Sequence, residues 1–82
     1  MEQGKFLELC SEVSRLPEGL NYMRQNVPEK LTVIHDGIRY YPYRLICCYI
    51  NGERKLRAVL HDLEANSTNE VPLEEVTKGE LR

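Results

Sequence analysis

The dipeptide Asn51-Gly52 separates two segments in which apolar residues recur at every second position. Such alternation is typical of half-buried β-strands, and an Asn-Gly pair between two of them predicts a tight hairpin turn. The strand before the turn is expected over residues 38–50 and the strand after it over residues 53–61. This hairpin constrains the fold most, because a two-residue loop fixes which residues face each other across it.

A two-residue loop pairs Ile50 with Glu53 and sorts the rest of the hairpin into two faces. Odd-numbered residues of the first strand meet apolar partners: Cys47 with Leu56, Leu45 with Ala58, and Tyr43 with Leu60. Even-numbered residues form the pairs Cys48 with Lys55, Ile46 with Arg57, and Arg44 with Val59. One face is therefore apolar throughout and the other is mixed, so the apolar face is expected to pack on helices.

Two further strands are expected beside this hairpin. Residues 31–34 form the first strand, and a three-residue loop with a glycine bulge at Asp36-Gly37 keeps Leu31 and Val33 on the apolar face. Residues 70–76 form the last strand, which Pro72 confines to a sheet edge because proline cannot donate to a central ladder. A thirteen-residue strand interrupted by Pro42 and flanked by a bulge predicts a strongly bent sheet.

The amino-terminal part of the chain has the helical period. Phe6 is followed by apolar residues at i+3, i+4, i+7 and i+10, which are Leu9, Cys10, Val13 and Leu16. This spacing predicts a helix over residues 2–15. Pro17 ends this helix and opens a second, shorter one that reaches residue 27. The expected fold is one α+β domain over residues 1–82. A helix or helix pair (2–27) covers a four-stranded antiparallel sheet (31–76), with an SH3-like half-barrel as its most curved form and a frayed tail (77–82).

Composition places the chain among ordinary globular proteins, with 41% hydrophobic and 29% charged residues. The acid-studded amino terminus does not have the pattern of a signal peptide, and the uncharged stretch from Leu45 to Ile50 is too short to span a membrane. Three cysteines, two of them adjacent, do not form a disulfide framework. We therefore expect reduced thiols, a cytoplasmic location and no membrane association.

Neither metal binding nor catalysis is predicted. The candidate metal ligands are Cys10, Cys47, Cys48, His35 and His61. Their positions in the sequence lack the spacing of a structural zinc site. His61-Asp62 resembles a catalytic dyad, but neighbours in a strand point to opposite faces and no serine or cysteine lies in an elbow-type turn. No phosphate-binding glycine motif is present. The chain is therefore expected to be a non-enzymatic protein without a cofactor.

The best functional candidate is the mixed face of the hairpin. Residues 39–57 carry five bases and one acid, whereas residues 58–82 carry six acids and two bases. The bases on the mixed face alternate with apolar residues, which suits docking of an acidic protein or a nucleic-acid backbone. Six residues form this candidate site: Arg44, Lys55, Arg57, Ile46, Ile50 and Tyr40. The alternative reading is that the charges solvate the face and cover its aliphatic residues with their stems.

A homodimer is the other possibility. Val71 and Leu73 alternate on the expected edge strand, and a second edge is expected near Leu31. Unprotected edges invite pairing with another chain, and a core this small gains from burying more surface. The alternative function is therefore a structural oligomer built by edge-strand pairing, without a separate ligand.

Residues 31–76 resemble small uncharacterised proteins of bacterial prophages and conjugative elements. The residues that carry the resemblance are Gly37, Tyr40, Pro42, the run from Ala58 to Leu63, the run from Ala65 to Ser67, Val71, Leu73 and Val76. The resemblance implies a cytosolic protein of a mobile element and brings no known activity. Together with the basic face, it leads to the expectation of a binding or accessory protein of such an element.

Overall fold

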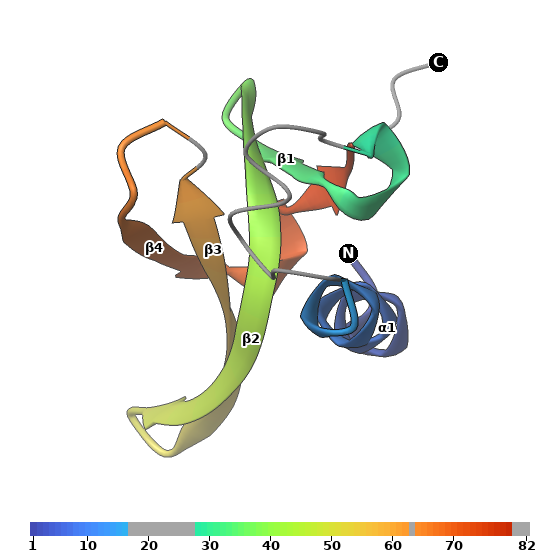
Figure 1. Cartoon of the computed structure of the whole chain (residues 1–82). Helices are drawn as coiled ribbons and strands as arrows, with labels where there is room; N and C mark the ends of the chain where they lie inside the picture. Colours follow the sequence, from blue (N-terminus) through green and yellow to red (C-terminus); the bar gives the residue numbers. More distant parts are fainter. Residues whose placement is uncertain (17–27, 63, 80–82) are drawn as a thin grey trace.

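The computed structural model describes residues 1–16, 28–62 and 64–79, and it shows one helix packed on an antiparallel sheet (Figure 1). The elements are α1 (Gln3–Ser14), η1 (Glu29–Leu31), β1 (Val33–His35), β2 (Ile38–Ile50), β3 (Glu53–Asp62), β4 (Thr68–Pro72), η2 (Leu73–Glu75) and β5 (Thr77–Lys78). The strand order is β4-β3-β2-β1-β5, so the sheet is open and the expected α+β class is confirmed. The second helix expected over residues 17–27 lies outside the described residues.

Helix α1 buries the apolar stripe that its sequence predicted. Phe6 is fully buried, Leu9 and Val13 are almost so, and Cys10 and Leu16 pack at the margin of the same core. Their i, i+3, i+4 spacing places them on one side of the helix. The residues on this side belong to the same core as the residues of the sheet.

The β2–β3 hairpin has the predicted turn and most of the predicted register. Asn51 and Gly52 both have positive φ, at 52° and 80°, as a two-residue hairpin turn requires. Cys47 faces Leu56 and Leu45 faces Ala58, which confirms the apolar face. The predicted pair of Tyr43 with Leu60 is wrong, because a β-bulge at residue 43 places Pro42 opposite Leu60 instead.

The first turn also differs from the prediction, and the same bulge explains why. His35 pairs with Ile38 across a two-residue loop in which Asp36 and Gly37 both have positive φ, so no glycine bulge occurs there. Val33 consequently faces the even-numbered Tyr40. It is nevertheless buried in the core, because the bulge at residue 43 exchanges odd and even positions along β2. The predicted glycine bulge at Asp36-Gly37 is therefore wrong, and the bulge that keeps Val33 on the core side lies at residue 43.

Residues 77 and 78 were expected in the frayed tail, yet they form β5, which pairs with β1. An arginine on β2 fixes this end of the molecule. Arg39 Nη1 donates to Thr32 Oγ1 at 2.6 Å and to the Gly79 carbonyl at 2.8 Å, while Nη2 contacts Glu29 Oε1 at 3.1 Å. Gly79 is required here because an added Cβ would overlap the hydroxyl and the backbone of Thr32.

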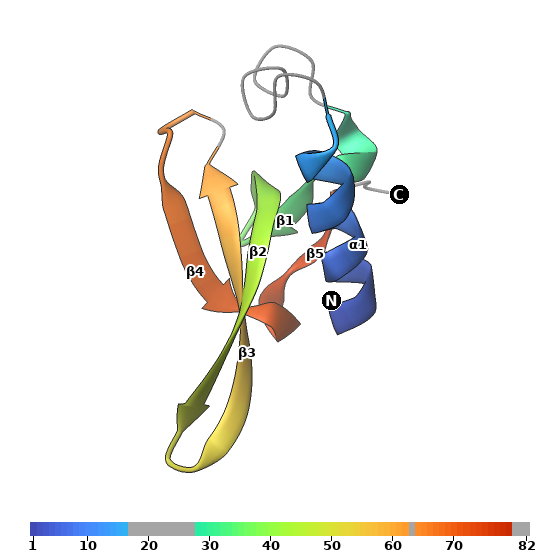
Figure 2. The same cartoon turned by 60° about the horizontal axis from the view of Figure 1, so that its bottom comes forward.

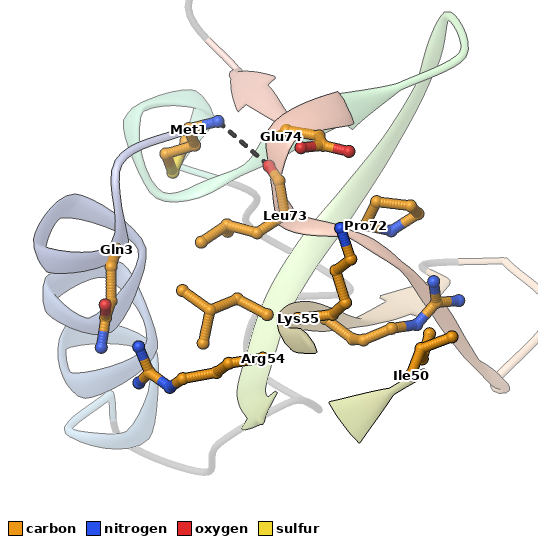
Figure 3. Close-up of a pocket in the computed structure, with 10 residues that line it drawn as sticks. Met1, Gln3, Ile50, Arg54, Lys55, Pro72, Leu73 and Glu74 are labelled. Atoms are coloured by element: carbon orange, nitrogen blue, oxygen red, sulfur yellow. Dashed lines mark hydrogen bonds between the residues drawn. The ribbon is translucent and has the colours of Figure 1, made fainter. Parts of the chain in front are cut away.

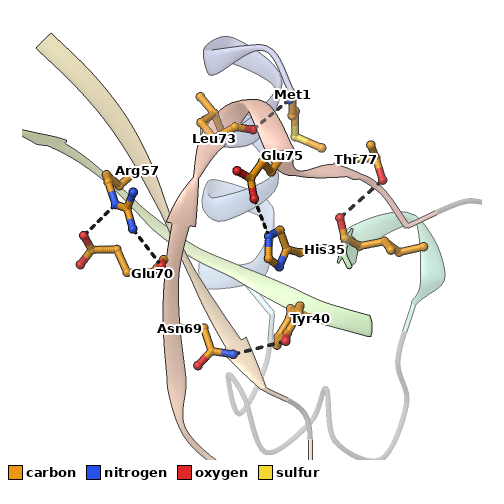
Figure 4. A network of polar contacts seen from close by, with 10 residues as sticks. Met1, His35, Tyr40, Arg57, Asn69, Glu70, Leu73, Glu75 and Thr77 are labelled. Atoms are coloured by element: carbon orange, nitrogen blue, oxygen red, sulfur yellow. Dashed lines mark hydrogen bonds and ion pairs between the residues drawn. The ribbon is translucent and has the colours of Figure 1, made fainter. Parts of the chain in front are cut away.

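The last long strand lies earlier than predicted. β4 spans Thr68–Pro72 at the sheet edge, and the chain then turns into η2. The edge position of Pro72 is confirmed, but Leu73 lies in η2 and is buried rather than alternating along the strand. The amino group of Met1 donates to the Leu73 carbonyl at 3.0 Å, which ties η2 to the start of α1 (Figure 4).

Candidate binding surface

One end of the β2–β3 hairpin extends beyond the rest of the molecule (Figure 2). We call residues 46–57 the distal hairpin. β4 pairs with β3 no further than Arg57, and β1 pairs with β2 no further than Tyr40. Among the described strands, none therefore lies on either outer edge of the distal hairpin. Most of its side chains are exposed to solvent, among them Tyr49 at 71% and Ile50 at 48%.

The predicted basic residues share a face as expected, but their surroundings differ. Arg44 is exposed, and its guanidinium carbon lies 5.7 Å from the centre of the Tyr43 ring. Lys55 is exposed and contacts Glu53 at 3.1 Å. Arg57 is half-buried, because its Nε contacts Glu70 Oε1 at 3.1 Å and its Nη2 donates to the Glu70 carbonyl. Arg57 therefore joins β3 to β4 (Figure 4), whereas Arg44 and Lys55 are exposed to solvent.

The apolar members of the predicted site lie on this same face. Ile50 is exposed beside the turn, and Ile46 is half-buried further along β2. They face Glu53 and Arg57, respectively, across the hairpin. The structure thus brings aliphatic and basic side chains together as the alternation predicted.

Tyr40 does not belong to this surface. It was expected on the mixed face, but it is only 6% exposed and its hydroxyl accepts a hydrogen bond from Asn69 Nδ2 at 3.3 Å (Figure 4). The bulge at residue 43 places it on the core side, next to Val33. The same bulge leaves Tyr43, which was expected to face the core, 49% exposed.

The sequence prediction missed Arg54. Its position opposite Tyr49 assigns it to the apolar face, yet it is exposed and its Nε donates to Cys47 Sγ at 3.2 Å. Strand length was the signal that could have found it. Strands of thirteen and ten residues are much longer than the usual five or six, so part of their apolar face was bound to extend past the helix.

A hollow of about 590 Å³ lies where the distal hairpin meets α1 and η2 (Figure 3). The hairpin contributes Ile50 and the four consecutive residues 54–57 to its lining. Pro72, Leu73 and Glu74 line it from the end of β4 and from η2, and Met1 and Gln3 from the start of α1. Three basic side chains and one acidic side chain therefore surround a partly apolar hollow.

Two neighbouring titratable residues at the end of β3, Asp62 and His61, lie outside this surface. Asp62 Oδ1 accepts hydrogen bonds from the backbone N–H groups of Ala65 and Glu64, which hold the pKa of this carboxyl below its usual range. Its neighbour His61 is buried, opposite Tyr41 in the sheet. The Asp62 carboxylate is thus engaged by the loop that follows β3.

His35 and Cys10, two of the candidate metal ligands, have separate surroundings. His35 Nε2 lies 3.0 Å from Glu75 Oε1, and this contact joins β1 to η2 (Figure 4). Burial raises the pKa of the Cys10 thiol to about 11, so this thiol stays protonated at neutral pH. Within the described part of the chain, no three histidine, cysteine or carboxylate side chains gather as a metal site would require.

Comparisons with known proteins found no matching family model, no similar curated protein and no similar solved structure. Within residues 1–16, 28–62 and 64–79, no helix has the length and apolar character needed to cross a membrane.

Proposed function

We propose that this chain is a non-catalytic binding protein that docks an acidic partner protein through the distal hairpin and the basic face next to it. One observation carries the proposal. Basic and apolar side chains gather on a part of the sheet that projects beyond the helix and contributes little to the core. Exposed apolar residues beside cations are typical of surfaces that bind another macromolecule.

Charge favours a protein over a nucleic acid as the partner. Residues 43–57 carry four bases and one acid, a balance of +3. Because the whole chain carries −2, the remaining residues carry −5 and would repel a long phosphate backbone. Two of the four bases are also engaged by carboxylates, Lys55 by Glu53 and Arg57 by Glu70. A local acidic segment suits this surface better than an extended polyanion.

The setting that we propose is that of an accessory protein of a bacterial mobile element, acting in the cytoplasm. Its support is the resemblance of residues 31–76 to small proteins of prophages and conjugative elements. The alternative, an oligomer built by edge pairing, has less support from the fold. Leu73 is buried in η2, and β5 covers the outer edge of β1, where the second open edge was expected.

Charge reversal tests the docking surface. The triple variant Arg44→Glu, Arg54→Glu, Lys55→Glu changes three exposed cations and leaves the Arg57–Glu70 contact intact. Its matched control, Lys5→Glu, Lys30→Glu, Lys78→Glu, makes the same change in net charge away from the hairpin. With peptides selected from a random dodecapeptide library on the unmodified chain, we expect the hairpin variant to weaken binding about tenfold or more and the control to weaken it far less.

Equal losses in the two variants would contradict the proposed surface. So would tight binding of a random-sequence DNA or RNA duplex at physiological salt that the hairpin variant abolishes, because it would identify a nucleic-acid partner instead.

A further inference from the structure

We infer that the partner binds as an additional β-strand on the outer edge of β3, at residues 53–56, directly beyond the end of β4. The inference rests on the proposed function and specifies its binding mode. Peptides that add a strand to an open sheet edge gain affinity from main-chain hydrogen bonds and specificity from pockets for alternate side chains. Both requirements have a counterpart on this edge.

The first counterpart is the place where β4 ends. β4 follows β3 from His61, opposite Thr68, to Arg57, opposite Pro72. Proline has no N–H group with which to continue the ladder, and the chain turns into η2 at Leu73. The next four residues of β3 remain paired with β2 on one side, while no described strand lies on the other. β3 thus has an edge that is paired with β2 on one side but is covered by β4 for only part of its length.

The second counterpart is the shape of the hollow. Residues 54, 55, 56 and 57 all line it, although successive side chains of a strand point to opposite faces of the sheet. Arg54 and Leu56 belong to the apolar face, and Lys55 and Arg57 to the mixed face. A hollow that is lined by four consecutive residues, whose side chains belong to both faces of the sheet, runs along the strand edge. It does not lie over one face.

The chemistry of the lining defines the occupant. Arg54 and Lys55 are exposed on opposite sides of the edge, while Ile50, Leu56 and Leu73 supply apolar surface. Glu74 is the acidic residue among the lining side chains. An extended segment of about four residues at ~3.3 Å each matches the open edge. We therefore expect an acidic peptide in which carboxylates alternate with aliphatic residues.

The outer edge of β2 is a poorer match for the same partner. No described strand pairs with it along the distal hairpin either, but residues 45–50 include no basic side chain. The hollow takes a single residue from this strand, Ile50. Charge complementarity therefore assigns the acidic strand to β3.

Backbone N-methylation of the peptide tests strand addition without altering the protein. Peptides are first selected from the random dodecapeptide library on the unmodified chain, and each N–H of the bound core is then methylated in turn. An added strand directs alternate N–H groups at the edge, so we expect methylation of one alternating set to weaken binding about tenfold or more and of the other set about twofold or less. We also expect the peptide to slow amide exchange within residues 53–56 of the protein.

The possible outcomes separate the two proposals. Binding that is lost in the hairpin charge variant but insensitive to methylation at every position would overturn strand addition and leave the docking surface in place. Protection within residues 45–50 in place of 53–56 would overturn the assignment to β3. Selected peptides that bind the hairpin charge variant as tightly as the unmodified chain would overturn the proposed function itself.

Discussion

The two ends of the β2–β3 hairpin have opposite environments, although they belong to the same pair of strands. At the proximal end, residues 38–45 and 58–62 contribute Tyr41, Ala58 and Leu60, none of which is exposed. At the distal end, Tyr49 is 71% exposed. Twelve residues of α-helix span about 18 Å, whereas thirteen residues of strand span about 43 Å, so α1 is too short to cover β2.

Strand length can thus divide one hairpin into a structural part and a part available for binding. The proximal part is held between α1, β1 and β4, and it contributes Tyr40, Tyr41, Ala58 and Leu60 to the core. No described strand covers the outer edges of the distal part, and several of its side chains are exposed to solvent. Four predictions sharpen this contrast.

Truncation in the core is expected to have the largest effect. Phe6→Ala removes a fully buried ring from α1 and should lower the free energy of unfolding by about 3–5 kcal/mol. Tyr49→Ala removes a ring at the distal end and should change it by about 0.5 kcal/mol or less. Urea unfolding monitored by circular dichroism measures both, and comparable losses would contradict the division of the hairpin.

Removal of the Arg39 side chain is expected to come next. Arg39→Ala eliminates the contacts to Thr32, Gly79 and Glu29 that fix η1 and β5 to β2. Hydrogen bonds to charged groups contribute about 1.5–3 kcal/mol, so unfolding should become easier by a similar amount. The exposed Arg54→Ala is the matched control on the distal hairpin and should have little effect. Equal unfolding midpoints for Arg39→Ala and the unmodified chain would show that this end of the molecule is stabilised in another way.

Shortening the hairpin is expected to have a moderate effect on stability and a complete effect on binding. Deleting residues 47–50 and 53–56 joins Ile46 and Arg57 through the same Asn51-Gly52 turn, which keeps the ladder in phase because Ile46 already faces Arg57. The loss of the partly buried Leu56 should cost about 1–2 kcal/mol. Calorimetry measures the stability of this variant, and a chain that no longer folds would show that the distal hairpin is structural.

The smallest effect concerns pH and the loop after β3. The folded-state pKa of Asp62 lies below that of the unfolded chain, so its contribution to stability is present above about pH 4 and is lost as the pH falls through the folded pKa. Asp62→Ala should therefore be less stable than the unmodified chain at pH 6, and the difference should shrink under acid conditions. Unfolding curves at several pH values measure this difference, and a gap that stayed constant down to pH 2 would contradict the role of the hydrogen bonds to Glu64 and Ala65.

The sequence predicted the parts of this fold that depend on local chemistry. Asn51-Gly52 specified its turn, and strict alternation then specified the distal register. The alternation of apolar residues predicts that one bulge interrupts the strands, but it does not show where. The sequence therefore favoured Asp36-Gly37, whereas the bulge lies at residue 43. This displacement is why Tyr40 was assigned to the surface. The sequence did not predict β5, because two residues, Thr77 and Lys78, are too few to show an alternation of apolar and polar positions. They form a strand because they pair with β1.

The candidate site was predictable in its faces but not in its extent. Lys55, Arg44 and Ile50 lie on the predicted face because parity decides the face. The roles of Arg54 and Arg57 could not be predicted in this way. They depend on how far α1 covers the sheet and on where the pairing of β4 with β3 stops, and both are tertiary features.

Native-state amide exchange of the unmodified chain tests the central claim most directly, because it measures the local stability of each part of the hairpin. We predict that amides within residues 58–60 exchange with a free energy close to that of global unfolding. Amides within residues 47–55 should exchange through local opening, whose free energy is lower than that of global unfolding by about 2–4 kcal/mol. Equal protection along the whole hairpin would contradict the division into a structural proximal part and a distal part available for binding.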